Sequence, residues 1–491
     1  MTDFEQEPRD ILARLTALRD ADAPTHGGHV LSYVYDSGLA ELDTLASDAM
    51  KLVQPVNGLD PTTFTSVAVM EGEVVAFARE LLGGDADVVG SVTTGGTESC
   101  LLAVKTARDN WSGTGKPRLL APVTVHAAFQ KAAHYFGLEL DLVPVLPSGA
   151  VSAEALIDRM GVDVALVVVS APSYPHAALD PIARVAAAAA ERGIACHVDA
   201  CIGGLVLPFW PGLPDWDLRV PGVTSISADL HKFGYAPKGA SVLLQRGRDR
   251  QRSQYFATTQ WPGYPVVNAT MLGSKSAGPL AAAWAIIHAL GRDGFAALAA
   301  SCERSTESLV DLVESIEGLR VVGSPVGPLL AVATDESLPP ERRVDPHHWA
   351  DQARAHGWLL QLQPGLAQSD GTVLPPTTHL TITPVTEAVL PHLSAALVLA
   401  ADEVRGEPPV SPSDVLAALP EGMLEGLGEL NSATAFAVLQ GIGLVSADAS
   451  LPDRMAPFLA LIAALPAPLT ERLLTELLAR VVEPRAQSVA E

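Results

Sequence analysis

Hydrophobic positions between residues 88 and 250 form two patterns. One consists of short continuous apolar runs, and the other consists of longer segments with helical spacing. The short runs predict strands over residues 88–94, 118–123, 138–145, 164–170, 194–200, 223–227 and 241–245. The longer segments predict helices over residues 95–110, from 126 onward, over 153–160 and from 180 to 193. Residues 164–170 are apolar throughout, which is typical of a parallel strand buried on both faces. This alternation predicts an α/β fold with a mainly parallel sheet.

The flanking segments carry different patterns. Helices are expected at 3–20, where Ile11, Leu12, Leu15 and Leu18 share one face, and at 39–52 and 67–82. A long helix over 279–316 should break near residues 291–294, and residues 320–384 read as strand, helix, strand and strand. We therefore expect an N-terminal arm with helices (1–87), a large domain (88–316), a small α/β domain (317–403), and a linker with a helical tail (404–491).

Composition narrows the range of functions. With 491 residues and 48% hydrophobic side chains, the chain is long enough for two or three globular domains. The formal net charge of −24 argues against nucleic-acid binding, because no basic patch is available to neutralise phosphates. The four cysteines are scattered, which is typical of reduced thiols in the cytoplasm. The N-terminus is too polar for a signal peptide, and no apolar run is long enough to span a membrane.

Lys232 is the first candidate for chemistry. It follows the β-prone residues 223–227 directly after His231, and Gly234 and Gly239 keep the backbone irregular beyond it. A lysine fixed at a strand end among apolar residues suits imine chemistry, because burial is expected to lower its pKa and free its lone pair. Taken alone, a surface lysine beside a turn would explain the same residues.

Other residues make the interpretation specific. Asp199 ends an apolar strand, where a carboxylate would need a cationic partner. Gly95, Gly96 and Thr97 stand at the expected start of a helix, whose free N–H groups suit a phosphate. In chain order, this glycine loop, His126, Asp199 and the His231–Lys232 pair resemble the pyridoxal-phosphate (PLP) enzymes of the aspartate-aminotransferase fold type (fold type I). The resemblance is greatest to the sphingosine-1-phosphate lyase branch of the group II decarboxylase superfamily and covers residues 28–400.

The resemblance implies roles for particular residues. Lys232 would hold PLP as an imine, Asp199 would pair with the pyridine nitrogen, and His126 would stack on the ring. The further cofactor contacts would be Gly95, Gly96, Thr97, His231 and Ser274. The substrate contacts would be Tyr35, Gln54, Asn57, Lys238 and Lys275. The resemblance also implies a homodimer in which the segment containing Ser274 and Lys275 reaches the cofactor phosphate of the neighbouring subunit.

Two positions depart from the family pattern. Gln54 and Asn57 stand where the family has an asparagine and a histidine, and neither amide can act as a base at neutral pH. Lys275 stands in place of an arginine and keeps the charge without the bidentate fork. We expect no metal site, a surface position for His347 and His348, and a helix cap at Asp180.

Three functions remain open from the sequence. The leading hypothesis is a PLP-dependent carbon–carbon lyase, similar to sphingosine-1-phosphate lyase, that cleaves a phosphorylated or otherwise anionic amino substrate. The first alternative is decarboxylation of an amino acid. The second is a PLP-fold protein that binds or scaffolds a partner without catalysis.

Overall fold

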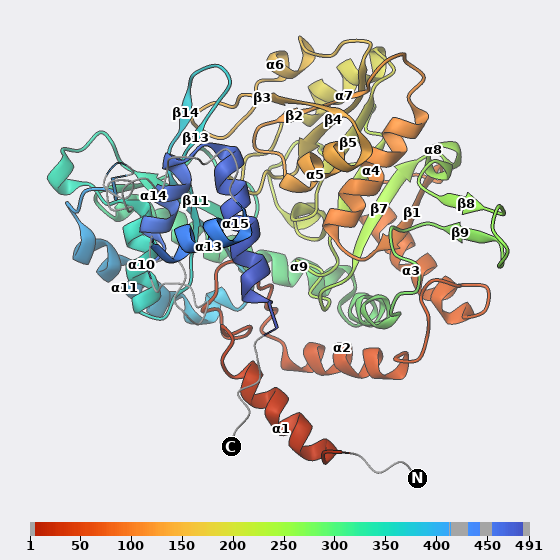
Figure 1. Ribbon diagram of the computed structural model, residues 1–491, viewed down its shortest axis with the longest axis horizontal. Coiled ribbons are helices and arrows are strands. Elements are labelled where there is room, and N and C mark those ends of the chain that lie inside the picture. The colour runs from red at the N-terminus through yellow and green to blue at the C-terminus, as the bar shows by residue number, and fades with distance from the viewer. Residues whose placement is uncertain (1–4, 412, 414–430, 442–453, 485–491) are drawn as a thin grey trace.

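The computed structural model describes residues 5–411, 413, 431–441 and 454–484. Its largest element is a seven-stranded sheet in the order β1-β7-β6-β5-β4-β2-β3 (Figure 1). The strands are β1 (Val88–Thr93), β2 (Arg118–Pro122), β3 (Glu139–Val143), β4 (Val164–Ser170), β5 (Ala195–Asp199), β6 (Ser225–Ala228) and β7 (Ser241–Arg246). Only β7 runs antiparallel to its neighbours in this sheet. The expected mainly parallel α/β fold is confirmed.

Side chains of β4 explain why the sheet is covered on both faces. All seven residues of β4 are buried. Leu166 and Val168 pack against α4 (Gly96–Asn110) and α5 (Ala127–Phe136), while Val167 and Val169 belong to the core on the opposite face. That second core also takes in α3 (Thr65–Leu81), α7 (Ile182–Glu191) and the part of α9 (Gly278–Ser315) up to Cys302. A continuously apolar strand therefore packs against helices on both faces of the sheet.

A second, smaller sheet follows the long helix α9 (Gly278–Ser315), which breaks at Gly291 as the sequence predicts. Its antiparallel order is β10-β11-β15-β12. The elements of this region are β10 (Leu319–Val321), β11 (Leu329–Thr334), α10 (Pro346–Ala355), β12 (Gln361–Gln363), β15 (Thr377–Thr381) and α11 (Thr386–Val404). The smaller sheet and its helices enclose a separate hydrophobic core. Trp349 is fully buried in this core, and its indole N–H donates to the Leu397 carbonyl at 2.9 Å.

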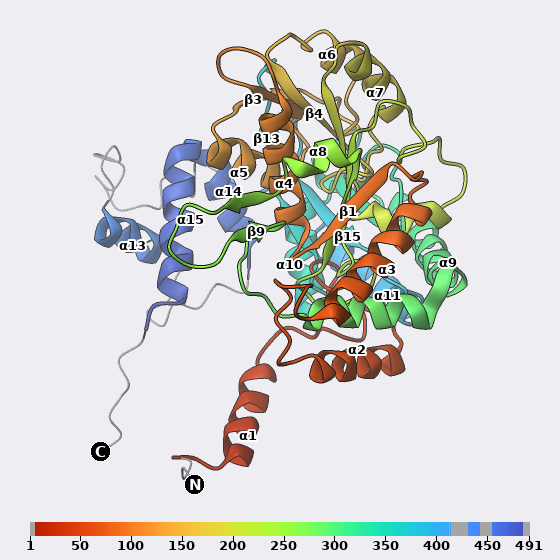
Figure 2. The same ribbon diagram turned by 90° about the vertical axis from the view of Figure 1, so that its right-hand side faces the viewer.

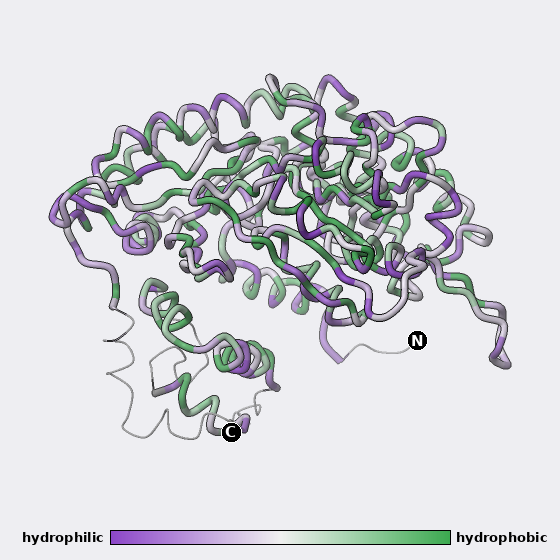
Figure 3. The backbone as a smooth tube through the Cα atoms, turned by 90° about the horizontal axis from the view of Figure 1, so that it is seen from above, coloured by the Kyte–Doolittle hydropathy of each residue, from purple (hydrophilic) through white to green (hydrophobic). Residues whose placement is uncertain are grey.

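Helices at the two ends of the chain lie outside these layers. Figure 2 shows α2 (Ala40–Leu52) alongside α9, whereas α1 (Pro8–Arg19) projects away and buries none of its residues within the chain. The described part of the tail forms α13 (Ser432–Gly441), α14 (Ala456–Ala464) and α15 (Ala467–Val481), a cluster beside the main body (Figure 3). The rest of the expected tail lies outside the described residues. Among the described helices, none combines the length and apolar character that a membrane span requires.

Several local expectations differ from the structure. Asp180 does not cap α7, whose first flanking residue is Pro181; its carboxylate instead accepts a hydrogen bond from the Ser170 backbone N–H at 2.7 Å. His347, expected at the surface, is buried, and its Nε2 lies 2.8 Å from the Gln363 carbonyl oxygen.

Four short strands and four short helices were not expected from the sequence as separate elements. They form where too few residues participate for a periodic pattern. They are the hairpins β8 (Phe256–Thr258) with β9 (Val266–Asn268) and β13 (Leu366–Ala367) with β14 (Val373–Leu374), α8 (Arg248–Arg252), and the 3-10 helices η1 (Gly203–Leu205), η2 (Leu207–Phe209) and η3 (Pro340–Arg342). The expected helix α6 (Ala153–Ile157) ends three residues before its predicted boundary.

Candidate active site

Lys232 lies in the turn that follows β6, at the carboxyl edge of the large sheet. Its Nζ is 3.0 Å from Oδ2 of Asp229, whose side chain is 1% exposed. His231 places its Nε2 3.6 Å from the same carboxylate oxygen. The Asp-Leu-His-Lys segment thus folds into a buried ion pair, because residues three apart in a turn face one another.

Charges around Lys232 reverse the expected direction of its pKa. Burial by itself lowers the pKa of this amine, but the negative charge of Asp229, with smaller contributions from Tyr35, Cys201 and Asp199, holds it well above its ordinary value. For Asp229, burial raises the pKa, yet the charges of Lys232 and His231 outweigh burial and lower it. The prediction that burial lowers the pKa of this lysine and frees its lone pair is therefore wrong, because it overlooked the carboxylate of Asp229 three residues earlier.

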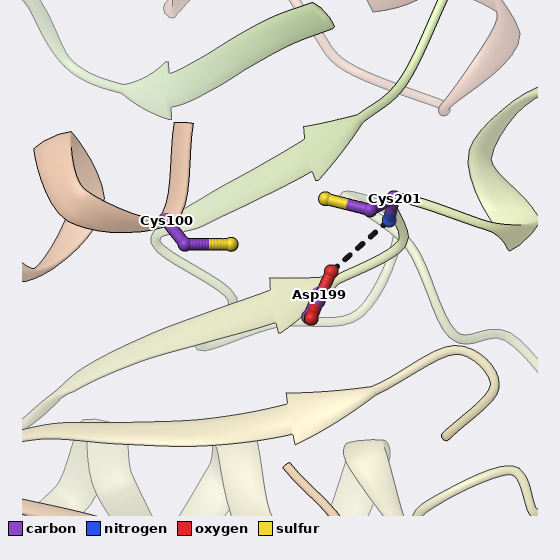
Figure 4. Close-up of side chains that lie close together, drawn as sticks. All are labelled: Cys100, Asp199 and Cys201. Carbon is purple, nitrogen blue, oxygen red and sulfur yellow. Dashed lines mark hydrogen bonds between the residues drawn. The ribbon is translucent and has the colours of Figure 1, made fainter. Parts of the chain in front are cut away.

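Asp199 ends β5, the strand next to β6, which leads into the Lys232 turn. Its Oδ1 accepts hydrogen bonds from the Cys201 backbone N–H at 3.1 Å and from the Ser227 hydroxyl at 3.4 Å. The thiols of Cys100 and Cys201 lie beside it (Figure 4), and a carboxylate oxygen of Asp199 and the two sulfur atoms are within 4.8 Å of one another. A buried carboxylate at the end of a parallel strand is well placed to meet a cationic ring nitrogen.

The amino end of α4 forms an anion cradle next to this edge. Gly95 has φ of 147°, a backbone conformation that side chains disfavour, and it turns the chain from β1 into the helix. At Gly96, a Cβ would lie 2.6 Å from Oδ2 of Asp229 and 2.9 Å from the Cys201 sulfur. Glu98 ties the loop down by accepting from the Thr94 N–H at 2.6 Å. Glycine is required at 96 because the Lys232 ion pair packs directly against the helix start.

Two adjoining cavities, of about 520 and 610 Å³, open at this edge. Both are lined by His126, Cys201 and Lys232. Asp199 and Tyr35 also line the first cavity. The second adds the remaining cofactor and substrate candidates at this edge, namely Gly95, Gly96, Thr97, His231 and Lys238. The structure thus brings together residues from five separate stretches of sequence.

His126 is both a cap and a cavity residue. It immediately precedes α5, and its Nδ1 accepts a hydrogen bond from the Ala128 N–H at 3.2 Å. This bond orients the imidazole while its ring remains on the wall that the two cavities share. Capping and a cofactor contact are therefore compatible at this position.

Lys238 and Tyr35 meet at the boundary between the cavities. The Lys238 Nζ lies 4.6 Å from the centre of the Tyr35 ring and donates to the His231 carbonyl at 3.3 Å. Burial, followed by the charge of Lys232, lowers the pKa of Lys238 to about 8. Burial raises the pKa of Tyr35 to about 12, so this phenol stays protonated at neutral pH.

Four predicted contacts lie away from both cavities. Gln54 is exposed, and Asn57 uses its side chain within the chain: its Nδ2 donates to the Ser274 hydroxyl at 3.2 Å, and its Oδ1 accepts from the Lys275 N–H at 3.3 Å. Lys275 lines only a small neighbouring cleft. In this chain Asn57 holds the segment that contains Ser274 and Lys275, so its direct contact with a substrate remains a prediction.

Sequence reasoning missed several cavity residues. Asp229 stands three residues before Lys232, and that spacing was the available signal. Lys131 of α5 lines the second cavity. It stands five residues after His126, a spacing that did not predict a shared site. The small-domain residues that close the first cavity are more than 100 positions from Lys232 along the chain; they are Gln361, Leu362, Gln363, Pro364, Gly365, Leu366, Leu374, Pro375 and Thr377.

Comparison with known proteins accounts for this arrangement. The family model for the pyridoxal-dependent decarboxylase conserved domain matches residues 32–331. The chain belongs to the pyridoxal-dependent decarboxylase family. This confirms the resemblance that the motifs indicated, and pyridoxal 5'-phosphate is the cofactor. A second model, named for a C-terminal HTH domain of pyridoxal-dependent enzymes, matches residues 413–480, the tail that the sequence motifs left unexplained.

Individual members of the family are similar over most of the chain. The sphingosine-1-phosphate lyase of Dictyostelium discoideum is 37% identical over 66% of this chain and 63% of its own length. That of Saccharomyces cerevisiae is 30% identical over 82% of this chain and 68% of its own length. The first curated relatives are thus matched over roughly three fifths of their length. The solved sphingosine-1-phosphate lyase of Burkholderia pseudomallei superposes with a TM-score of 0.75 at 32% identity, covering 83% of this chain and 93% of that one.

The residues at this edge fit PLP. Lys232 supplies an amine and Asp199 a carboxylate on one cavity wall. The start of α4 supplies backbone N–H groups, and Lys131 adds a cation to the second cavity for the phosphate of PLP. Oδ1 of Asp229 is buried and has no hydrogen-bond partner among the described residues, which indicates that a polar ligand binds at this edge.

Proposed function

We propose that the chain is a PLP-dependent lyase that breaks a carbon–carbon bond in a phosphorylated or otherwise anionic amino substrate. Its similarity to proteins named sphingosine-1-phosphate lyase supports this proposal. One observation carries the proposal: Lys232 and Asp199 line a single cavity that adjoins the anion cradle at Gly95 and Gly96. This arrangement supplies a covalent anchor, a partner for the ring nitrogen and a phosphate site within one space.

Each residue has a distinct task in this proposal. Bound PLP supplies an electron-poor ring that accepts the electron pair of the bond that breaks. Lys232 anchors the cofactor and afterwards holds or moves a proton at its Nζ. Asp199 keeps the ring nitrogen charged, and His126, fixed by its bond to Ala128, supports the face of the ring.

The boundary between the cavities supports an anionic substrate. The ammonium of Lys238 stands over the Tyr35 ring, where a substrate phosphate would meet a partly buried cation. Beyond it, the first cavity presents apolar walls to the rest of the substrate: Val123, Pro172, Pro175, Ile202, Leu362, Pro364, Leu366, Leu374 and Pro375. A substrate with a charged head and an apolar tail fits both regions.

The quaternary structure is also part of the proposal. We infer a homodimer in which the loop that carries Ser274 and Lys275 reaches the neighbouring subunit. In support, the β8–β9 hairpin just before this loop exposes Phe256, Trp261 and Tyr264, at 59%, 46% and 69%. All four cysteines are free and buried, which is compatible with a reducing compartment such as the cytoplasm.

A substrate panel tests the activity. Holoenzyme would be incubated with amino acids and with phosphorylated amino alcohols of different chain length, while aldehyde and carbon dioxide are measured in parallel. Aldehyde release from the phosphorylated amino alcohols, lost in Lys232→Ala, is the expected result. Carbon dioxide without aldehyde would refute the carbon–carbon lyase. If the protein showed no lysine-dependent absorbance band of bound PLP, a binding or scaffold role would replace both enzymatic functions.

Amino-acid decarboxylation is the second candidate. The observation in its favour is that neither Gln54 nor Asn57 lines the cavities, so the loop offers no group for the proton transfer that the lyase resemblance places there. Asn57 is engaged with Ser274 and Lys275. Carbon dioxide release from one amino acid in the same panel would establish this alternative.

A further inference from the structure

A chain of buried hydrogen bonds runs behind Asp199 across strands β5 and β6. The ring of His197 lies between two serines, with Nδ1 2.8 Å from the Ser225 hydroxyl and Nε2 3.2 Å from the Ser227 hydroxyl. The Ser227 hydroxyl continues the chain to Oδ1 of Asp199 at 3.4 Å. His197 and Ser227 have no exposed surface, so water cannot substitute for any of these bonds.

The donors and acceptors along this chain can be assigned. An ionised Asp199 carboxylate only accepts, so the Ser227 proton points to it. The Ser227 oxygen is then free to accept from Nε2–H of His197 and from the Cys201 thiol at 3.3 Å. Nδ1 of His197 accepts from Ser225. Burial lowers the pKa of His197 to about 4, in keeping with a neutral ring that has one donor and one acceptor.

Ser227 is therefore the centre of the network. It donates once and accepts twice, which uses the full capacity of a hydroxyl. Its bond and the bond from the Cys201 N–H both reach Oδ1 of Asp199. No hydrogen bond within the described residues reaches Oδ2, which leaves that oxygen for a ligand.

We propose that Ser227, held by His197, is a positioning residue that aims the Asp199 carboxylate at the pyridine nitrogen of PLP. The inference rests on the PLP site described above. Removing the hydroxyl deprives Oδ1 of a donor and lets the carboxylate rotate. The pyridine nitrogen then loses part of its proton, because a misdirected carboxylate stabilises the charged ring less well.

The test uses PLP labelled with ¹⁵N at the pyridine nitrogen. Wild type, Ser227→Ala and a control, Ser305→Ala, would be reconstituted, and the ¹⁵N resonance and the PLP dissociation constant measured. Ser305 is a buried serine of α9 whose hydroxyl has no hydrogen-bond partner among the described residues, so its removal tests loss of a buried hydroxyl alone. Thermal unfolding of each cofactor-free variant reports whether it is folded.

In Ser227→Ala we expect the resonance to move toward that of neutral pyridine and the dissociation constant to rise about tenfold, the low end for loss of a supporting hydrogen bond at a ligand site. The control should match wild type. If Ser227→Ala does not fold, Ser225→Ala, which removes the outer donor to His197, should move the resonance in the same direction by less. A folded Ser227→Ala with the wild-type resonance overturns the proposal. Wild type without any PLP binding refutes the cofactor site itself.

Discussion

The buried Lys232–Asp229 pair makes a prediction about stability that does not depend on activity. Replacing Lys232 by methionine leaves the Asp229 carboxylate, 1% exposed, without the partner that lies 3.0 Å from it. At that distance the attraction is about 5–6 kcal/mol for an effective dielectric constant of about 20. Loss of one member of a buried pair typically costs about 3–5 kcal/mol, because the remaining charge stays desolvated. We expect Lys232→Met to lower the free energy of unfolding of the cofactor-free protein by this amount at pH 8.

A double-mutant cycle isolates the interaction. Asp229→Asn alone should also destabilise, since it leaves the Lys232 ammonium buried, whereas the double variant should recover most of the loss. The measurement is urea unfolding of the four cofactor-free proteins. Once Lys232 is absent, burial raises the Asp229 pKa, so the defect of Lys232→Met should shrink as the pH falls and the carboxyl takes up a proton. Additive losses, or a Lys232→Met protein as stable as wild type at pH 8, would refute the reasoning.

Three further predictions concern the cradle, the substrate cation and the tail. Gly96→Ala should weaken PLP binding by at least about tenfold in a fluorescence titration, because its Cβ would lie 2.6 Å from the Asp229 carboxylate, while Gly72→Ala, which meets nothing within 4 Å, should bind PLP as wild type does. Since the pKa of Lys238 is about 8, KM for an anionic substrate should rise as the pH passes 8 and the ammonium is lost; in Lys238→Arg, KM should stay flat over the same range. Asp351 caps α14 by accepting from two backbone N–H groups at 2.8 and 2.9 Å, so Asp351→Ala should destabilise that helix by about 1 kcal/mol and speed amide exchange over residues 456–464. Unchanged exchange there would show that packing alone holds the tail.

The parallel sheet explains why much of the site was predictable. Asp199 and the Lys232 turn follow neighbouring parallel strands, and in such a sheet the carboxyl ends of the strands meet at one edge. Gly95 and Gly96 join that edge because β1 also ends there. The order of motifs along the sequence was therefore enough to predict that these candidate cofactor residues lie at one edge of the sheet.

The remaining features depend on contacts that the sequence does not display. The position of Asn57 follows from bonds to a segment more than 200 residues away. The wall that Leu362 of β12 and Leu374 of β14 add to the first cavity comes from segments more than 100 residues beyond Lys232. Such long-range packing leaves no periodic signal in the chain.

The central claim is that Lys232 carries the cofactor. Its most direct test is reduction of the PLP-loaded protein with borohydride, which fixes the bond between PLP and its lysine, followed by proteolysis and mass spectrometry of the peptides. The account predicts a single modified peptide with the label on Lys232, and none in Lys232→Ala. A label on Lys238 or Lys131 instead, or no modified peptide from wild type, would contradict it.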